Sequence, residues 1–275
     1  MNILQISIQA PGYNSGGTLG ILQFSYALTR NNKVTYIGPK IESEDIESWF
    51  EKTIYMSRKL TPVEKIQSLM HMEFDKYYIL WNKIDINFND YDVIYIDFTR
   101  WQYVVKSIKK SGYKGKIIVR AHNVEKDYLR VEYKSQRTIS SYIKSILAGH
   151  REKYMVNMAD MILAITPEDK KRLIDLYKVE EQKIVVCPVG VNSSKCRQKK
   201  PVEKGQKLNC LITGSLWFGP NATGALWVLK EVMPKVSDIC ELTIAGANPN
   251  NDITNACKET NTLLVASPKS MKPYF

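Results

Sequence analysis

The amino-acid sequence predicts an α/β protein whose main sheet is parallel and covered by helices on both faces. Short strand-like runs alternate with amphipathic helical patterns along most of the chain, which is typical of parallel sheets with helical crossovers. Runs such as Ile117-Ile118-Val119 are apolar throughout, as expected of a strand buried on both faces. A polar, aperiodic segment interrupts the alternation after about residue 192, and a second α/β pattern follows it.

Length and composition fit one large or two ordinary globular domains. The chain has 275 residues, 44% of them hydrophobic, enough to bury a sizeable core. No apolar stretch approaches the roughly 18 residues that cross a bilayer, and the initial MNILQISI has no basic region or cleavage site. The five cysteines form no CxxC pair, which favours reduced thiols in a cytoplasmic protein over a disulfide framework or a zinc site.

The elements of the first unit are predicted from local patterns. In TPEDKKRLIDLY, Thr166 is a candidate N-cap, Pro167 suits the first helical position and Asp169 places acid in the first turn. Apolar periodicity assigns the other segments. We expect strands at residues 2–8, 33–37, 92–97, 116–121, 160–165 and 183–187. We expect helices at residues 18–30, 62–81, 101–111, 124–157 (as two helices) and 167–178.

A linker separates this first unit, residues 1–192, from a second one. Residues 193–207 are polar, lack periodicity and contain a proline. Residues 208–275 then begin a second α/β unit, with strands expected at 208–216, 240–248 and 261–268 and helices at 222–236 and 250–260. Because the chain ends at Phe275, we expect a truncated second unit with an uncovered sheet edge, through which two copies of the chain could dimerise.

The connection between the first strand and the first helix is rich in glycine. Gly16 and Gly17 stand just before the expected helix, with Gly12 and Gly20 nearby. Glycines let a backbone approach a phosphate closely, and the free N–H groups of a helix N-terminus attract the anion. The spacing is not GxGxxG, so the dinucleotide fingerprint is absent. A ligand loop and a tight structural connection are both compatible with this segment.

His122 lies where a strand passes into a helix, within IVRAHNVEKDYLR. Parallel α/β sheets place ligands at the carboxyl ends of their strands, and this position raises the functional interpretation above a histidine bonded structurally in a loop. The other two histidines have different contexts: His71 lies on an apolar helix, and His150 shares a helical face with Ile146. Packing is favoured for both, and three histidines in separate contexts make no metal site.

Acidic residues occur at both ends of the third expected strand. Asp90 and Asp92 form a DxD pattern that can hold a divalent metal, but they stand at the start of the strand, away from the ligand edge. Asp97, where the strand ends, is the stronger candidate. No GxSxG, HExxH, Walker A loop or Cys–His signature is present, which disfavours several hydrolase and NTPase classes.

The chain is basic, with 39 Lys and Arg against 28 Asp and Glu and a net charge of +11. Residues 106–116 and 195–207 carry much of this charge. A solubilising surface, attraction to an anionic membrane and nucleic-acid binding all remain open. A nucleic-acid binder needs exposed aromatics between its basic residues, whereas most aromatics here fall on faces expected to be buried, so we expect no nucleic-acid partner.

Four stretches occur in a characteristic order along nearly the whole chain. SGGTLG follows the first strand, and RAHNVEKDYLR contains an HN(V/I)E-type segment. ADMILAITPEDKKRL then leads to KIVVCPVGVN, and LITGSLWFGPNATGALWVLKEVMP leads to LTIAGANP. Together these stretches resemble the retaining GT-B glycosyltransferases of the family-four-like group, in which the third stretch precedes the interdomain hinge and the fourth opens the nucleotide-sugar lobe.

The resemblance implies a GT-B-like fold with a complete N-terminal Rossmann-like lobe and an incomplete C-terminal one. It also implies a hexosyltransferase that moves a sugar from a nucleotide-sugar donor to a glycan or lipid-linked acceptor in cell-surface polysaccharide synthesis. No metal or other cofactor is implied, because backbone N–H groups and basic side chains stabilise the leaving diphosphate in such enzymes. The implied location is cytoplasmic, and the positive charge adds an expectation of peripheral contact with the anionic inner face of a membrane.

The same resemblance implies roles for individual residues. His122 would face the donor sugar as the catalytic residue. The implied donor-binding residues are Gly16 and Gly17 against the diphosphate, Gly214 and Ser215 against the phosphates from the second lobe, and Gly246 in the nucleotide pocket. The residues implied on the acceptor side are Asp97, Glu125 and Arg130.

The sequence departs from the group's pattern in the second unit. No cation occurs between Gly214 and Lys230, where the group places Lys or Arg, and the group's acidic ExxxxxxxE-type motif would lie beyond Phe275. The alternative is therefore a catalytically incompetent fragment or a non-catalytic nucleotide- or anion-binding α/β protein. An NAD-dependent Rossmann enzyme is disfavoured, since YIGPK places no acidic residue at the end of the second strand.

Overall fold

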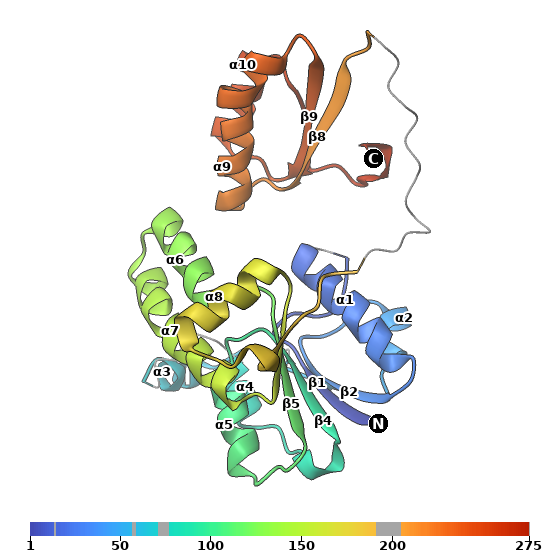
Figure 1. The fold of residues 1–275 in the computed structure, drawn as a ribbon, viewed down its shortest axis with the longest axis vertical. Coiled ribbons are helices and arrows are strands. Elements are labelled where there is room, and N and C mark those ends of the chain that lie inside the picture. Colours follow the sequence, from blue (N-terminus) through green and yellow to red (C-terminus); the bar gives the residue numbers. More distant parts are fainter. Residues whose placement is uncertain (14, 57–58, 71–76, 191–204, 275) are drawn as a thin grey trace. The chain divides into compact units, whose positions relative to one another are not determined.

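The computed structural model describes residues 1–13, 15–56, 59–70, 77–190 and 205–274. The chain divides into two compact units, Met1–Asn192 and Ser193–Phe275, each with its own sheet and helices (Figure 1). Most of the expected linker, up to residue 204, lies outside the described residues, as do residues 71–76 of the helix expected at 62–81.

The described part of the first unit contains a parallel sheet of seven strands in the order β3-β2-β1-β4-β5-β6-β7. The strand order reverses between β1 and β4, and parallel α/β sheets bind ligands outside the carboxyl ends of their strands at such a point. The strands are β1 (Asn2–Ile6), β2 (Lys33–Gly38), β3 (Lys52–Tyr55), β4 (Val93–Asp97), β5 (Lys116–Ala121), β6 (Met161–Ala164) and β7 (Ile184–Val186). All six strands predicted for this unit are confirmed, and β3 is an additional edge strand of four residues.

The helices of the first unit alternate with these strands. They are α1 (Gly16–Thr29), α2 (Glu44–Glu47), α3 (Pro62–Met70), α4 (Tyr77–Trp81), α5 (Gln102–Lys110), α6 (Glu125–Gln136), α7 (Ile139–Met158) and α8 (Pro167–Tyr177). Single 3₁₀ turns lie at Phe88–Asp90 and Glu181–Lys183. None of the helices in the described ranges combines the length and apolar character needed to cross a bilayer.

Local signals explain several helix ends. The predicted start of α8 is confirmed, with the Thr166 hydroxyl accepting a bond from the Asp169 N–H at 3.0 Å. The predicted split within 124–157 is also confirmed: α6 ends at Arg137 with φ of +50°, and Thr138 caps α7. Helix α1 begins at Gly16 rather than at residue 18, because Ser15 and Thr18 form a capping box.

The two faces of the first sheet differ in character. Side chains alternate along a strand, so Leu4, Ile6 and the residues in register with them line one face, which packs against α5, α7 and α8. Ile3 and Tyr95 line the other face together with Leu22 of α1. Near the carboxyl ends of β1, β4 and β5, this second face becomes polar.

The second unit repeats the α/β pattern on a smaller scale. Its described part has three parallel strands in the order β10-β9-β8. The strands are β8 (Leu208–Ser215), β9 (Cys240–Ala247) and β10 (Leu263–Ala266). The helices are α9 (Gly219–Trp227), a π-helical turn (Val228–Val232), α10 (Met233–Val236), α11 (Asn251–Glu259) and a 3₁₀ turn (Lys272–Tyr274). Both units therefore have the predicted α/β class.

Candidate functional site

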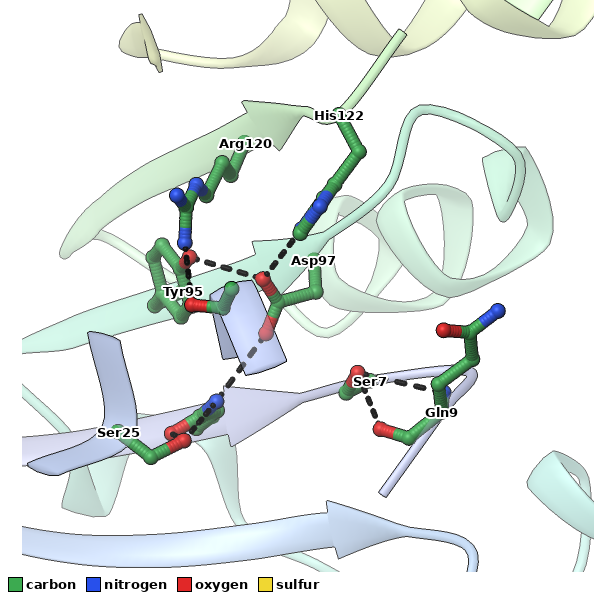
Figure 2. A network of polar contacts seen from close by, with 9 residues as sticks. Ser7, Gln9, Ser25, Tyr95, Asp97, Arg120 and His122 are labelled. Carbon is green, nitrogen blue, oxygen red and sulfur yellow. Dashed lines mark hydrogen bonds and ion pairs between the residues drawn. The ribbon is translucent and has the colours of Figure 1, made fainter. Parts of the chain in front are cut away.

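A buried polar network lies beneath α1 at the carboxyl ends of β1, β4 and β5 (Figure 2). Its members share one face of the sheet: Gln5 on β1, Tyr95 and Asp97 on β4, and His122 just after β5. Burying a polar group is costly unless it is hydrogen-bonded, so each member must find partners inside the protein. This concentration of polar side chains at the ligand edge makes it the candidate site.

Asp97 is the centre of the network. Its Oδ1 accepts bonds from the Tyr95 hydroxyl at 2.9 Å and from His122 Nε2 at 3.0 Å, and its Oδ2 accepts one from Gln5 Nε2 at 3.1 Å. An ionised carboxylate can only accept, so Nε2 of His122 carries the proton in this bond. Gln5 also exchanges bonds with the Ser25 hydroxyl, at 2.9 and 3.1 Å, which ties the network to α1.

The phenol of Tyr95 stays protonated in this environment. Burial, reinforced by the negative charge of Asp97, raises the pKa of Tyr95 well above its ordinary value. Tyr95 therefore acts as a permanent donor to the carboxylate. The shared Oδ1 atom thus has two fixed donors, the phenol and the imidazole.

The imidazole of His122 is held on several sides, and its side chain is only 5% exposed. It stacks on Phe98, with ring centroids 4.1 Å apart and planes at 17°. Phe98 has a φ of +74°, which a bulky non-glycine residue adopts rarely and only where the surrounding structure holds it. Within the described ranges, Nδ1 of His122 has no hydrogen-bond partner from the protein.

Helix α1 passes directly beside His122. A Cβ atom placed on Gly20 would lie 3.9 Å from Cε1 of the imidazole. Gly20 comes one turn, about 6 Å along the helix axis, after Gly16. The first turn of α1, which contains Gly16 and Gly17, is therefore a neighbour of the histidine.

Arg120, on β5, anchors the same part of α1. It is fully buried, and its Nη1 donates to the carbonyl oxygen of Gly20 at 3.0 Å. Its guanidinium lies 4.6 Å from the centre of the Phe24 ring, which in turn stacks on Tyr95 at 5.0 Å. Among the residues that the structure describes, the Nε atom of Arg120 has no hydrogen-bond partner. A buried cation thus lies under the helix that begins with the two glycines.

A second buried carboxylate, Glu152 of α7, holds the turn that carries His122. It accepts backbone bonds from Glu125 at 2.8 Å and Lys126 at 3.1 Å, and so caps the N-terminus of α6. The hydroxyls of Thr99 at 2.9 Å and Tyr177 at 2.6 Å complete its shell. Burial raises the pKa of Glu152, although these four bonds work in the opposite direction. Since α6 begins three residues after His122, this cap fixes the start of the helix next to the histidine.

Glu125 connects this cap to the ring beneath His122. Its Oε2 accepts from Arg100 Nε at 2.6 Å, whereas its Oε1 is buried and has no hydrogen-bond partner in the described part of the chain. Burial raises the pKa of Glu125 to about 7, and the charge of Arg100 offsets only part of this effect. The guanidinium of Arg100 also lies 5.8 Å from the Phe98 ring and 5.3 Å from the Tyr128 ring.

The structure joins some of the residues predicted for the first unit. His122 and Asp97 are hydrogen-bonded at one edge beside Gly20, which lies one turn after Gly16, and Glu125 reaches the Phe98 ring through Arg100. Arg130 is exposed on α6 and does not join the network. The DxD carboxylates instead have structural roles: Asp92 accepts from the Asn2 N–H at 2.8 Å, and Asp90 from the Asn87 amide at 2.7 Å.

The candidate residues of the second unit lie at two neighbouring strand ends. Gly214 of β8 is in register with Gly246 of β9, and Ser215 ends β8. A Cβ atom on Gly246 would collide with the carbonyl oxygen of Gly214, so only glycine allows the two backbones to approach. Asn221 donates to the Ser215 carbonyl at 3.2 Å. This edge is formed by backbone rather than by ionisable side chains.

Sequence reasoning missed several members of the site, namely Gln5, Tyr95, Phe98, Arg100, Arg120 and Glu152. One signal could have found the strand residues: in otherwise apolar strands, polar residues at alternate positions must share a face. Asp97 with Tyr95, and His122 with Arg120, follow this spacing. Among the residues that the structure describes, no three His, Cys, Asp or Glu side chains gather as a metal site would require.

Comparison with known proteins places this geometry in context. The sequence profile of glycosyltransferase family 4 matches residues 15–195. The chain is similar in structure to the apo form of the lipopolysaccharide outer core galactosyltransferase WaaB, with a TM-score of 0.61 and 16% identity over 100% of this chain and 70% of that chain. No curated protein sequence matches the chain.

Two further solved structures are similar. For a glycosyltransferase from Rickettsia africae ESF-5, the TM-score is 0.56 at 16% identity, covering 98% of this chain and 69% of that chain. For Anabaena Alr3699/HepE in complex with UDP and glucose, it is 0.55 at 11% identity, covering 96% and 68%. At these identities the likeness shows the fold, and the predicted GT-B-like architecture is confirmed.

Proposed function

Because the chain belongs to glycosyltransferase family 4, we propose that it transfers a hexosyl group from a nucleotide-sugar donor to a glycan or lipid-linked acceptor. The observation that supports this most strongly is the hydrogen-bonded pair of His122 and Asp97, set beside the glycine-initiated helix α1 at the ligand edge of the sheet. We further propose that the reaction retains the anomeric configuration, takes place in the cytoplasm and contributes to cell-surface polysaccharide synthesis.

The first turn of α1 is suited to the donor's diphosphate. The first N–H groups of a helix have no intrahelical acceptor and attract anions; Ser15 caps that of Thr18, whereas Gly16 and Gly17 carry no side chains that would cover their own N–H groups. The buried guanidinium of Arg120 adds positive charge beneath the same helix. In the second unit, the close backbones of Gly214 and Gly246, with Ser215, would take the phosphates and the nucleotide.

His122 would meet the donor sugar through its free nitrogen. With Nε2 donating to Asp97, Nδ1 is the ring nitrogen left to accept a hydrogen bond from a sugar hydroxyl. Asp97 is then a positioning residue, since its oxygens accept bonds from within the protein and it acts on the substrate through His122. The residues proposed on the acceptor side are therefore Glu125, which would act through Arg100, and Arg130.

The leaving diphosphate would be stabilised by N–H groups and basic side chains, without a metal. One similar structure holds UDP and glucose, and another, a trehalose-6-phosphate protein of E. coli, holds UDP-2-fluoro glucose. We therefore propose a UDP-hexose as the first donor to test.

The test is release of UDP from UDP-glucose and UDP-galactose, measured with and without a chelator. We expect turnover that the chelator does not change, and a loss of about 100-fold in His122→Ala, comparable to removing one preorganised transition-state contact. His150→Ala is the matched control, because His150 is exposed on α7 and lies outside the network. Circular dichroism of both variants separates loss of activity from loss of folding.

One observation favours a second candidate, a non-catalytic nucleotide-binding protein. The stretch between Gly214 and Lys230 contains no cation to neutralise a leaving diphosphate. If the wild-type chain binds UDP-sugars by calorimetry and turns over none of them with any acceptor, the binding protein is the correct interpretation. A chain that neither binds nor turns over a UDP-sugar would contradict both candidate functions.

A further inference from the structure

The hairpin of α6 and α7 has a strongly basic outer surface. Lys126, Arg130 and Lys134 occur at intervals of four residues and so share one face of α6, and all three are exposed. Arg137, at the end of α6, is exposed as well. The acidic residues of α6 do not balance this charge, because none of them is fully exposed.

The acidic side chains of α6 are engaged elsewhere. Glu125 is buried and paired with Arg100. Asp127 forms a two-point ion pair with Arg172 of α8, at 2.6 and 3.0 Å, and Glu132 is half-buried. Every fully exposed charged side chain described between Glu125 and Ile146 is therefore basic.

Large apolar side chains are exposed on the same hairpin. On α7, Ile139 is 81% exposed, Tyr142 49% and Ile146 51%, and their spacing of three and then four residues places them on one stripe. Val131 of α6 is 52% exposed. Single exposed apolar residues are ordinary, but a stripe that stands beside a row of cations is typical of surfaces that lie on membranes.

The two helices are joined into one rigid surface. They pack side by side (Figure 1), with the rings of Tyr133 and Tyr142 5.2 Å apart. Glu152 of α7 bonds the first turn of α6, and Asp127 bonds α8, so the hairpin is fixed to the rest of the first unit. The basic row and the apolar stripe therefore keep their positions relative to each other.

We propose that this hairpin surface, meaning the four basic and four apolar side chains named above, binds an anionic lipid bilayer. The cations would lie among anionic headgroups while Ile139, Tyr142 and Ile146 enter the interfacial layer. A nucleic acid would use the basic row but gain little from a branched aliphatic side chain as exposed as Ile139. The proposed vesicle binding does not depend on the proposed function. Only the idea that the bilayer would bring a lipid-linked acceptor to the chain rests on that function.

The experiment is sedimentation of the full chain with vesicles, without any sugar nucleotide. We expect binding to phosphatidylcholine vesicles that contain phosphatidylglycerol, weakening as salt is added, and far weaker binding to phosphatidylcholine alone. Lys134→Gln with Arg137→Gln should weaken binding about 30-fold, at about 1 kcal/mol for each charge and 1.4 kcal/mol for each factor of ten. Lys109→Gln with Lys110→Gln, exposed at the end of α5, removes the same charge elsewhere and should change binding less than threefold.

The apolar stripe has its own variants. Ile139→Asn with Ile146→Asn should weaken binding at high as well as low salt, because insertion of apolar groups is not screened. Ile239→Asn with Leu263→Asn is the matched control, since both residues are exposed aliphatics of the second unit. Equal binding to neutral vesicles, or equal losses in the hairpin and control variants, would overturn the proposal.

Turnover separates this proposal from the proposed function. UDP release without vesicles should be unchanged in all four double variants, because none of them alters a residue placed at the candidate site. Vesicle binding by a chain that turns over no UDP-sugar would sustain the membrane surface and contradict only the transferase. Turnover of a UDP-sugar without vesicle binding would sustain the transferase and contradict the membrane surface.

Discussion

The carboxyl ends of the strands are built differently in the two units. In the first unit, ionisable side chains are buried at the edge and hydrogen-bonded to one another, with Asp97 accepting from Tyr95, His122 and Gln5. In the second unit, the edge is made of glycine backbone, with Gly214 and Gly246 in register. One architecture thus has a network of buried side chains at one edge and bare backbone at the other.

This difference indicates which kind of substitution each unit tolerates. A buried carboxylate depends on all of its donors, so the first unit is sensitive to the removal of polar partners. A close backbone approach depends on the absence of Cβ atoms, so the second unit is sensitive to the addition of a single methyl group. Substitutions that add or remove one group can therefore break each edge separately.

The largest expected effect is that of Gly246→Ala. Its Cβ would overlap the Gly214 carbonyl and crowd Leu216, and relief requires a backbone shift between two paired strands. We expect a loss of about 5 kcal/mol from the stability of the second unit, at the extreme of single substitutions. Hydrogen exchange resolved by segment would locate the loss within residues 205–274. Gly224→Ala in α9, where the new Cβ meets nothing within 4 Å, should instead be neutral or stabilise by up to about 1 kcal/mol.

Glu152→Ala should destabilise the first unit by about 4 kcal/mol. It removes the acceptor of four bonds, leaving the N–H groups of Glu125 and Lys126 and the hydroxyls of Thr99 and Tyr177 unpaired in a buried place. Urea denaturation of the variant, followed by tyrosine and tryptophan fluorescence, measures the change. Glu168→Ala, exposed in the first turn of α8, is the control, and an equal loss in both would contradict the role of Glu152 as a hub.

Glu125 should make the stability of the first unit fall as the pH rises from about 4.5 to 7. Its pKa is about 7 in the folded protein against an ordinary 4.5, so between these values the folded state holds a proton that the unfolded state has released. The loss amounts to roughly 3 kcal/mol, at about 1.4 kcal/mol for each pKa unit, and is complete above pH 7. Urea midpoints of wild type and Glu125→Gln from pH 5 to 8 test this. An unchanged pH slope in Glu125→Gln would assign the dependence to other groups.

The smallest expected effect is that of Asp97→Asn on stability, about 1–2 kcal/mol, because the amide fills the same space but must present an N–H to one of three donors. The effect of Asp97→Asn on the tautomer of His122 should be easy to observe. With ¹⁵N-labelled histidine, His122 should be the Nε2–H tautomer in the wild-type chain and a mixture of both tautomers in the variant. His150 serves as the internal reference. An unaltered His122 spectrum would show that Asp97 does not determine the tautomer.

Much of the fold could be predicted because its signals are local. Alternating apolar runs located the paired strands, and the Thr166-Pro167 start was confirmed by its cap. Strand β3 escaped because KTIY is short and lies at the sheet edge, where burial on both faces is not required. The start of α1 was placed two residues late because the pairing of Ser15 with Thr18 outweighs the low helix propensity of Gly16 and Gly17.

The candidate site was harder to predict, because its contacts join residues far apart in the sequence. The position of His122 after a strand was informative by itself, but its partner Asp97 is 25 residues away and Gln5 lies 92 residues from Asp97. Glu152 had no local signal at all: it lies on a long helix, and its burial is explained only by distant partners, namely the α6 terminus and the hydroxyls of Thr99 and Tyr177. Which donors surround a buried group depends on tertiary packing.

These separations have a consequence for the growing chain during synthesis. Arg120 bonds the carbonyl of Gly20 across 100 residues, and β1 cannot pair with β4 until the ribosome has released residues beyond Asp97. Until then Gln5 and Ser25 have no native carboxylate to bond, and the apolar strand β1 has an unpaired edge. Contacts between distant residues form slowly because a long loop must close first. The emergence of β5, with Arg120 and then His122, is thus the step at which the polar network of β1, β4 and β5 can first form, whereas the core also needs β6, β7, α7 and α8, which emerge later.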